Sequence, residues 1–485
     1  MIIYFFIALV APLVTPLLLL AAPPPSSISS KNASYNGNKL FLEGDVKLDH
    51  EFGQMSASEA YLEKDDKLKD FLFSLIHLQK NVLLNLKNHG QVLCEVADLN
   101  FHTLKGKFFP KLGEKITYME LLEKIKGGQA LLKLNSELAE IKISKSEEAY
   151  HIDEIEALKD VLIEYAEDFT LKAERAIFKE QEKKSIMAYP AEDSFCTLSH
   201  QGDRVYAKRI EFDLKELKLV FREAYGKLSS ILFPQVQKDE VKFNAGELIW
   251  DHPQGILKLK GGAFVEEGSF ASLQTDDEIE LRHVIQNKKR KLKTIVSKSN
   301  TFLKYVDPET DSVHLLNCKG PIMVDRENLS AVLESPKIEE KVAEEMQIAY
   351  EHESMAIRAN RADVQYKAEE KGMLLSSVSL EGNVRLSVEE EEKPSKLAVA
   401  DKVDLSPSDH TVILSASPGK KVLFWDAQQQ LSISAHQIKM IRDPLTGKDS
   451  VKGIGNVKFA FDSVEQTFLK KIFPFYEPPP SPSDS

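Results

Sequence analysis

The chain has 485 residues, of which 42% are hydrophobic and 28% are charged, and its formal net charge is −12 at pH 7. This composition describes a globular protein with room for roughly two to four domains, and its mild acidity gives little attraction for nucleic acid, so we expect no DNA or RNA partner. The three cysteines, Cys94, Cys196 and Cys318, are too few and too widely spaced for a dense disulfide framework or a CxxC metal site. They are either buried free thiols or include one disulfide, such as Cys94 with Cys196.

Residues 1–22 form an uncharged apolar segment that is long enough to cross a membrane as a helix. We expect either a cleaved signal peptide or a retained membrane anchor, and a buried core helix is the alternative. No Lys or Arg precedes the segment, and three prolines follow its small-residue end, so cleavage and retention both stay open. Residues 23–33 continue as a linker that begins with Pro and Ser.

From residue 40 the sequence alternates as a half-buried strand does. Apolar residues or Gly occupy every second position from Leu40 to Leu48, and charged residues occupy most of the positions between them. The central Gly-Asp-Val returns as EGNVRL at 381–386 and as IGNVKF at 454–459, with weaker copies in QKNVLLNL from residue 79 and LKDVLIEY from residue 158. A strand pattern that recurs along a long chain indicates tandem hairpins stacked on their neighbours.

A second pattern, Ala-x-x-apolar-x-apolar, recurs at similar intervals. The copies from Ala173 to Ala245 lie 34 and 38 residues apart, and those from Ala359 to Ala435 lie 41 and 35 residues apart. In copies such as that at Ala435, the apolar residues before and after the Ala are out of phase by one position, which a strand can absorb only through a bulge or bend. A small Ala at such a bend lets backbones approach closely; alternatively, it only fills a tight spot in the core. The predicted bend alanines are Ala57, Ala173, Ala207, Ala245, Ala359, Ala400 and Ala435.

Long helical periodicity is almost absent, and turn-forming runs separate the predicted strands, so we predict an all-β fold of antiparallel hairpins. The hairpins divide into three modules at 34–190, 191–336 and 348–473. A charged connector at 337–347 is the best helix candidate after the leader. Residues 474–485 are rich in Pro and Ser and are expected to form a disordered tail.

The order Gly-Asn-Val, hairpin, Ala-Asp-x-Val, hairpin and Gly-Asn-Val in residues 380–461 resembles the OstA-like, or Lpt, family of lipopolysaccharide-transport proteins. The opening stretch from residue 40 looks like a first repeat of the same kind, and looser echoes extend over most of residues 34–470. The resemblance implies an elongated antiparallel β-jellyroll with an apolar groove that is open along one side. Members of this family join end to end into a bridge across the periplasm, and lipopolysaccharide acyl chains are thought to travel inside it.

The chain differs from known members of this family in length. It is longer than the small periplasmic bridge component, and it lacks the long C-terminal run of amphipathic strands of the outer-membrane translocon. The resemblance therefore implies a periplasmic bridge component, either alone or combined with a membrane-anchored component. It places the chain in the periplasm, either soluble after signal cleavage or anchored in the inner membrane by residues 1–22. Other lipopolysaccharide-transport proteins are the expected partners, through docking of strand edges.

The in-phase apolar residues of the repeat are the expected lining of the groove. Each buried methylene of an acyl chain contributes about 0.8 kcal/mol, and a uniform repeated lining lets the chain shift while exchanging like contacts for like. The groove candidates are Val46, Leu48, Val384, Leu386, Val457 and Phe459. An ordinary sealed core is the alternative interpretation of these residues. Residues 454–461 are the candidate docking edge.

The densest basic run could contact phosphates of an anionic glycolipid, although a solvated loop is the alternative. It consists of Lys288, Lys289, Arg290, Lys291 and Lys293. We find no catalytic motif, no cofactor motif and no metal-ligand spacing among the twelve histidines, so we expect no enzyme, no cofactor and no metal. Asp276, Asp277 and Glu278 carry suitable oxygens for a cation but lie in a turn-like context.

These observations lead to two functional hypotheses. The first is that the protein binds lipopolysaccharide acyl chains in a β-groove and helps carry lipopolysaccharide across the periplasm to the outer membrane. The second is a structural or adhesive β-repeat protein of the cell envelope, with a sealed core and no lipid ligand. The two hypotheses differ in whether the apolar face of the repeats is open.

Overall fold

The computed structural model describes most of the chain from residue 27 onward. The described residues are 27–64, 73–87, 89–123, 128–145, 150–166, 168–179, 184–228, 241–268, 271–286, 289–306, 311–337, 342–369, 372–390, 393–443, 446, 449–474 and 476. The predicted leader at 1–22 lies outside them, and so do residues 477–485 of the predicted tail. Within these ranges, no helix has both the length and the apolar character that a membrane span requires.

The prediction of an all-β, antiparallel fold is confirmed. Strands make up nearly all of the described regular structure, together with one α-helix and two turns of 3₁₀ helix. The chain divides into two compact units: unit 1 is Met1–Tyr118 with Glu140–Ile152, and unit 2 is Met119–Ala139 with Asp153–Ser485. The module limits proposed after residues 190 and 336 both fall within unit 2, where strand pairing continues across them.

Unit 1 is built on successive antiparallel hairpins, because the backbone N–H and C=O groups of each strand need a neighbouring strand as hydrogen-bond partner. β3 pairs with β4, β4 with β5, β5 with β6, and β6 with β7, and the two short strands β1 and β2 pair with β3. The strands are β1 (Ser27–Ser29), β2 (Asn32–Tyr35), β3 (Lys39–His50), β4 (Gly53–Glu63), β5 (Leu75–Leu86), β6 (Gln91–Asn100) and β7 (Lys105–Phe109). The strands β8 (Ile116–Glu123), β10 (Leu138–Lys145) and β11 (Tyr150–Tyr165) have residues in both units, and β9 (Gln129–Ser136) belongs to unit 2.

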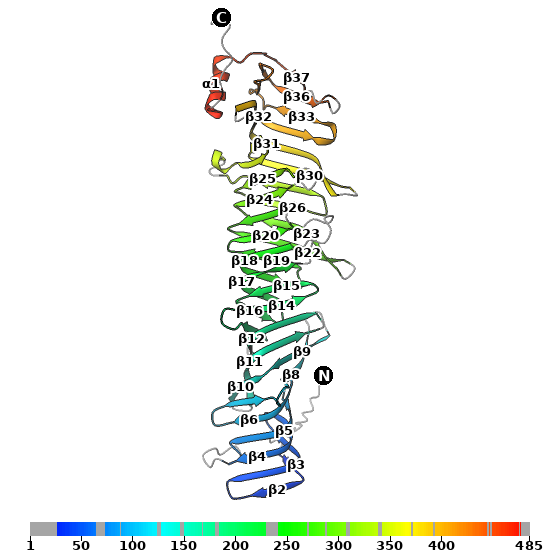
Figure 1. The fold of residues 1–485 in the computed structure, drawn as a ribbon, viewed down its shortest axis with the longest axis vertical. Helices are drawn as coiled ribbons and strands as arrows, with labels where there is room; N and C mark the ends of the chain where they lie inside the picture. Colours follow the sequence, from blue (N-terminus) through cyan, green and yellow to red (C-terminus); the bar gives the residue numbers. More distant parts are fainter. Residues whose placement is uncertain are drawn as a thin grey trace, which may run out of the picture. The chain divides into compact units, whose positions relative to one another are not determined.

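Unit 2 contains two series of paired strands, which we call ladder A and ladder B. Their successive strands can be followed from β12 to β37 in Figure 1. Ladder A contains β13 (Ser185–Tyr189), β16 (Arg209–Asp213), β19 (Ile256–Lys260), β22 (Glu278–Gln286), β23 (Lys289–Ser297), β26 (Ile322–Asp325), β27 (Ser330–Glu334), β30 (Arg361–Glu369), β33 (Thr411–Ser415), β36 (Gln437–Arg442) and β37 (Asp449–Ile454). Ladder B contains β14 (Cys196–His200), β15 (Asp203–Ala207), β20 (Ala263–Glu267), β21 (Ala271–Thr275), β24 (Thr301–Val306), β25 (Val313–Cys318), β28 (Ile348–His352), β29 (Met355–Ala359), β34 (Val422–Asp426) and β35 (Leu431–Ala435).

Longer strands join the two ladders, because one half of each pairs in ladder A and the other half in ladder B. In β31, for example, Leu380 pairs with Ala362 of ladder A, whereas Leu386 pairs with Ile357 of ladder B. The shared strands are β12 (Phe169–Lys179), β17 (Lys218–Leu228), β18 (Val241–Asp251), β31 (Gly372–Glu390) and β32 (Lys393–Ser406). We call the point where such a strand passes from one ladder to the other a corner.

The recurring Gly-Asp-Val motif lies at the corner of β31, and we also call the equivalent position of its other copies a corner. In all five copies the two residues before the Val have a φ between +45° and +78°: Gly44–Asp45, Lys80–Asn81, Lys159–Asp160, Gly382–Asn383 and Gly455–Asn456. Gly, Asn and Asp adopt this left-handed conformation most readily, which explains the composition of the motif. The first four pairs coincide with shifts in strand register. The irregularity predicted at the alanines is therefore present beside Ala57, Ala173 and Ala400. There, two residues of the partner strand lie opposite one residue of the strand that carries the alanine, so the extra residue belongs to the partner strand.

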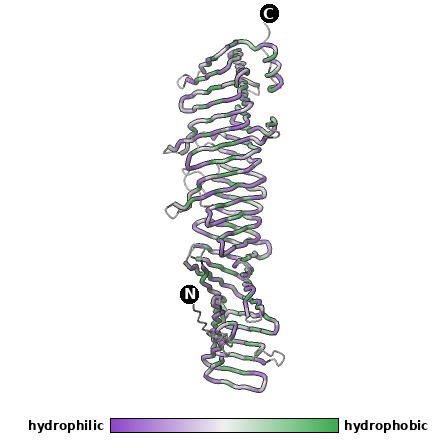
Figure 2. The backbone as a smooth tube through the Cα atoms, turned by 180° about the vertical axis from the view of Figure 1, so that it is seen from behind, coloured by the Kyte–Doolittle hydropathy of each residue, from purple (hydrophilic) through white to green (hydrophobic). Residues whose placement is uncertain are grey.

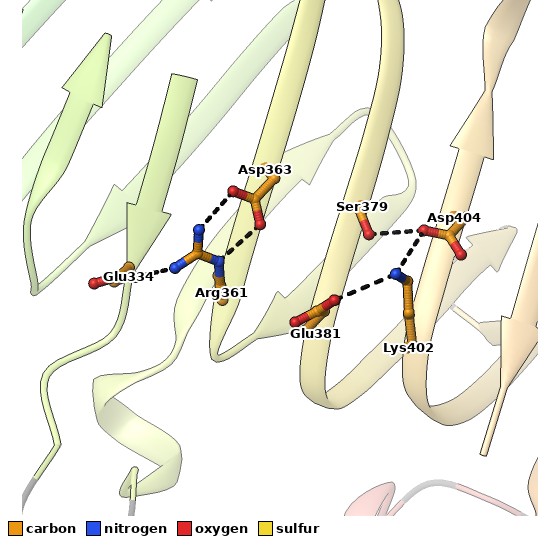
Figure 3. Close-up of polar contacts among 7 residues, drawn as sticks. All are labelled: Glu334, Arg361, Asp363, Ser379, Glu381, Lys402 and Asp404. Carbon is orange, nitrogen blue, oxygen red and sulfur yellow. Dashed lines mark hydrogen bonds and ion pairs between the residues drawn. The ribbon is translucent and has the colours of Figure 1, made fainter. Parts of the chain in front are cut away.

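The two faces of ladder A differ in chemistry. On one face, next to the corner, Arg361 makes two hydrogen bonds of 2.7 Å with Asp363 and also contacts Glu334 (Figure 3). On the same face, Lys402 lies 3.3 Å from Glu381 and 3.5 Å from Asp404 (Figure 3). The opposite face carries the apolar residues, and the alternation along the strands is visible in Figure 2. Buried residues of both ladders between Cys318 and Ile438 form one hydrophobic cluster, so the two ladders pack their apolar faces into a common core.

The C-terminal end of unit 2 differs from the sequence prediction. Helix α1 (Ser463–Ile472) was not predicted, although Asp462 and Glu465 form a capping box at its start. Its Leu469 packs with Trp425 and with Tyr476, which is only 1% exposed although it lies in the predicted disordered tail. Trp425 and Tyr476 make an edge-to-face ring contact, so burial against the sheet orders this part of the chain. In the predicted connector helix at 337–347, the described regular structure is a single 3₁₀ turn, Glu344–Met346.

Candidate functional site

The inward-facing residues of ladder A fall into rows that cross the strands, because cross-strand partners lie on the same face. The row next to the corners runs through Ile322, Leu333, Ala362, Leu380, Val403, Leu414 and Ile438. All of these side chains are at most 7% exposed. This row therefore seals the corner side of the core.

The next row outward is more exposed. It runs through Val324, Ala331, Val364, Val378, Leu405, Val412, Met440 and Val451. Apart from Ala331, which is buried, each of these side chains is half-buried and packs against the same core cluster. A line of apolar side chains that remains partly open to water across successive strands is an unusual use of surface, and such surfaces commonly mark binding sites.

Ladder B contributes a matching set of half-buried apolar residues. Leu316 pairs with Tyr350, and Ile357 links Tyr350 to Leu386 across the next strands. Together with the ladder A row these residues form what we call the apolar strip: Val324, Val364, Val378, Leu405, Val412, Met440 and Val451 from ladder A, and Leu316, Tyr350, Met355, Leu386 and Leu431 from ladder B.

The strip carries a polar group on ladder B. The Tyr350 hydroxyl is 2.7 Å from His314 Nδ1, and the His314 ring stacks on His352 with centroids 4.2 Å apart. Burial raises the pKa of Tyr350 to about 12, so its phenol stays neutral at physiological pH. The strip therefore presents no charged side chain of its own, and its aromatic hydroxyl already has a partner.

The exposure of the same row changes along ladder A. Before the strip it continues through Phe178, Ile186, Phe212, Leu219, Trp250, Leu257 and Leu281. All seven are at most 2% exposed. Leu281 then pairs with Ile295, which is half-buried, and Ile295 pairs with Val324 at the beginning of the strip. The row is closed up to β22 and partly open from β23 onward.

The six groove candidates occupy three kinds of environment. Val46, Leu48 and Val384 are sealed core residues, with exposed fractions of 1%, 4% and 1%. Leu386 belongs to the strip, and Val457 is half-buried against the same cluster. Phe459 is 71% exposed and lies beyond the last strand. Within the strands, Val46, Leu48, Val384 and Leu386 face inward, but the period of the repeat did not distinguish a position at a corner from one farther out, and Phe459 does not face the core.

The candidate docking edge at 454–461 is not a continuous strand. β37 ends at Ile454 because the left-handed pair Gly455–Asn456 turns the chain. Lys458 then makes a bridge to Ser434, with backbone hydrogen bonds of 2.9 Å and 2.8 Å, beside strand β35. Residues 455–461 therefore cover part of the edge of ladder B.

The predicted bend alanines lie at or beside corners. Ala207, Ala359 and Ala435 each end a strand, and one residue separates each from the following strand. Ala57, Ala173 and Ala400 pair directly with Val46, Val161 and Val384, the valines that follow left-handed pairs. Ala245 pairs with Ala224 in the shared strands β17 and β18. Six of the seven alanines are at most 7% exposed, and Ala173 is half-buried.

The charged candidates do not converge on the strip. Lys288 lies outside the described residues, Lys289, Arg290 and Lys291 fall in β23, and Lys293 makes an ion pair of 2.9 Å with Glu327. Asp276 and Asp277 accept hydrogen bonds from Asn300 and Ser299, and Glu278 pairs with Lys260 and Lys298. In the part of the chain that the structure describes, no group of three His, Cys, Asp or Glu residues is arranged to hold a metal ion.

The apolar strip as a whole was missed by sequence reasoning, except for Leu386. A signal for it exists, since its ladder A members lie two residues farther from a corner than the sealed row. To use this signal, one must know to which ladder each half of a strand belongs, and the sequence does not give this. Comparison with models of protein families gives no match, and comparison with curated proteins gives none either.

Proposed function

We propose that this chain binds lipopolysaccharide through its acyl chains and helps carry it across the periplasm to the outer membrane, with the apolar strip as the binding surface. The observation that supports this most is the row of half-buried apolar side chains across successive strands of ladder A. An acyl chain on this row would remove apolar surface from water, at about 0.8 kcal/mol for each buried methylene.

The repetition of the row favours transport over fixed binding. Neighbouring strands lie about 4.8 Å apart, and the residues presented along the row are similar in size and chemistry. An acyl chain that moves by one strand therefore exchanges one set of Val, Leu or Met contacts for another. The free energy of binding changes little during such a step, so a long apolar ligand can move without first dissociating.

The proposal includes a finer architecture, in which ladders A and B are the two walls of an antiparallel β-jellyroll. The sealed row at the corners would form the floor of its groove, and the apolar strip would line the opening. The chain would act in the periplasm, with residues 1–22 as a cleaved signal or an inner-membrane anchor. β37 has a described partner strand on one side only, β36, which leaves an edge for docking to another transport protein.

A structural or adhesive envelope protein is the second candidate. The closed row from Phe178 to Leu281 favours it for that part of unit 2, because a sealed core has no surface for a lipid. The two functions differ in what they require of the strip, where a purely structural protein gains nothing from apolar side chains that are open to water.

A pair of adjacent residues on β36 provides the test. Met440 belongs to the strip, whereas Ile441 is 40% exposed on the opposite face of the same strand. We expect the full-length chain to bind purified lipid A, measured by displacement of an apolar fluorophore. Met440→Gln should weaken binding about tenfold, because roughly 1.4 kcal/mol of apolar transfer free energy is lost, and Ile441→Gln should not.

Two results would contradict the proposal: no binding of lipid A by the unmodified chain, or equal effects of the two substitutions. In the cell, depletion of the protein should lower the amount of lipopolysaccharide at the outer surface. Unchanged surface levels after depletion would remove the transport role even if binding occurs.

A further inference from the structure

The closed row of ladder A includes two aromatic residues, Phe212 and Trp250, that belong to a cluster of rings from both ladders. Phe169 and His200 pair with each other at the outer end of ladder B, and their rings stack with centroids 4.0 Å apart. Phe212 and Trp250 lie on ladder A, where both pair with Leu219. We call these four residues, together with His252, the aromatic plug.

Ring contacts within the plug connect the two ladders. Phe169 of ladder B lies 5.7 Å from Phe212 and 5.9 Å from Trp250 of ladder A, measured between ring centroids. His200 lies 5.3 Å from Trp250, and His252 contacts Phe169, His200 and Trp250. Phe169, His200, Phe212 and Trp250 are all at most 6% exposed. Rings of this size in mutual contact fill the space that a ligand would need.

Along the described residues of the apolar strip, ring contacts do not connect the two ladders in this way. The ring contacts that the structure describes there, among Tyr305, His314, Tyr350 and His352, join residues of ladder B with one another. The ladder A residues of the strip are Val, Leu and Met, which are smaller or more flexible than Phe and Trp, and Tyr366 of β30 packs against the same cluster. Aromatic rings therefore connect the two ladders in the section with the closed row, whereas the residues of the apolar strip remain partly open to water.

We infer that the acyl-chain site of this protein is confined to β23–β37 and that the aromatic plug is its stop, so that lipid enters and leaves this section sideways and does not pass through the section from β12 to β22. The inference rests on the proposed function. Its physical basis is that a chain entering the plug must separate at least four packed rings and lose their contacts, whereas a chain on the strip covers surface that is already exposed to water.

The test uses the unmodified full-length chain and lipid A with a diazirine in one acyl chain. After illumination, the labelled peptides are mapped by mass spectrometry. We expect label in peptides that carry Val412, Met440 or Val451, and none in peptides that carry Leu219 or Leu257. Label in both groups would overturn the confined site while leaving lipid binding intact. Label in neither group would overturn the proposed function itself.

The role of the plug is tested by Phe169→Ala, with Phe195→Ala as its matched control. Phe195 is half-buried and contacts Tyr225 and Lys208, outside the plug. We expect Phe169→Ala to extend the label into peptides with Leu219 or Trp250, and Phe195→Ala to leave the wild-type map unchanged. Thermal unfolding followed by circular dichroism establishes that each variant is folded. A folded Phe169→Ala protein with the wild-type map would overturn the plug as the stop.

Discussion

Val384 lies directly opposite Ala400 across β31 and β32, one residue after the left-handed pair Gly382–Asn383. The two side chains are 1% and 4% exposed, so they fill the corner at which β31 passes between the ladders. The same relationship joins Val46 to Ala57 in unit 1. A small residue opposite a β-branched one allows the backbones to remain close where the strand changes direction.

The corner at Gly382 should be sensitive to a side chain. Gly382 has a φ of +78°, and an added Cβ would lie 2.6 Å from Asn360 Nδ2. Asn360 is held by hydrogen bonds to the Glu381 and Gly382 carbonyls and by Gln347. Gly419 has a similar φ of +82°, but nothing lies within 4 Å of its added Cβ. We expect Gly419→Ala to lower the free energy of unfolding by about 1–2 kcal/mol because of its left-handed backbone conformation. Gly382→Ala should lower it further, because its Cβ also meets Asn360.

Urea unfolding followed by circular dichroism measures both variants. If Gly382→Ala and Gly419→Ala lower the free energy of unfolding equally, the contact of the added Cβ with Asn360 has no effect on stability.

Unit 1 should lose stability in mild acid through His50. Burial lowers the pKa of His50 from 6.5 to about 4, and its ring packs 4.8 Å from that of Phe101. Below pH 6.5 the unfolded chain gains a proton at this residue that the folded chain does not accept. The contribution of neutral His50 to the free energy of unfolding is therefore present above pH 6.5. It is lost as the pH falls toward 4, and the loss is at most about 3 kcal/mol.

Denaturant unfolding at a series of pH values should show a smaller acid loss in His50→Gln than in the unmodified protein. His102→Gln is the control, because His102 is exposed. A pH dependence that is the same in all three proteins would assign the acid loss to other groups.

The cysteines should react slowly in the folded protein. All three are free thiols; Cys196 and Cys318 are buried, and Cys94 is half-buried. Burial raises the pKa of both Cys94 and Cys196 to about 12, so both remain thiols at pH 8. The contribution of these two thiols to the free energy of unfolding is fully present below pH 9. It is lost as the pH rises toward 12, because in that range the thiols ionise only in the unfolded chain.

An aromatic disulfide reagent at pH 8 should modify Cys196 only after urea is added. Rapid modification of Cys196 without denaturant would show that this section opens readily.

The chain after residue 462 should be held by Trp425 and Tyr476. These rings lie 5.3 Å apart, and the cluster around them includes Leu469 and Phe473. Tyr476→Ala should weaken the packing of α1 and cost about 3 kcal/mol, because a buried aromatic ring is removed. Fluorescence of Trp425 in a Trp250→Phe background should shift to longer wavelength, and an unchanged spectrum would count against the contact.

The alternation of the sequence determined that the chain forms antiparallel strands, and Gly-Asp-Val and its variants marked corners in both units. Both features are local, since a side chain's face follows from its position in the strand and a left-handed φ follows from Gly, Asn or Asp. The same local rules identified Val384 and Leu386 as inward-facing without separating the sealed residue from the half-buried one. They also placed Tyr476 in a disordered tail, because its Pro-rich neighbours carry no sign of the ring that covers it.

Only the tertiary structure decided which inward-facing residues remain open. Met440 and Trp250 belong to the same kind of row in ladder A, and both are apolar residues that face inward. Trp250 is buried because Phe169 and His200 of ladder B meet it, whereas Met440 is half-buried. Exposure depends on the side chains that the other ladder supplies, and for Trp250 these come from positions about 50 and 80 residues away in the chain. No periodicity within a strand can encode such a contact.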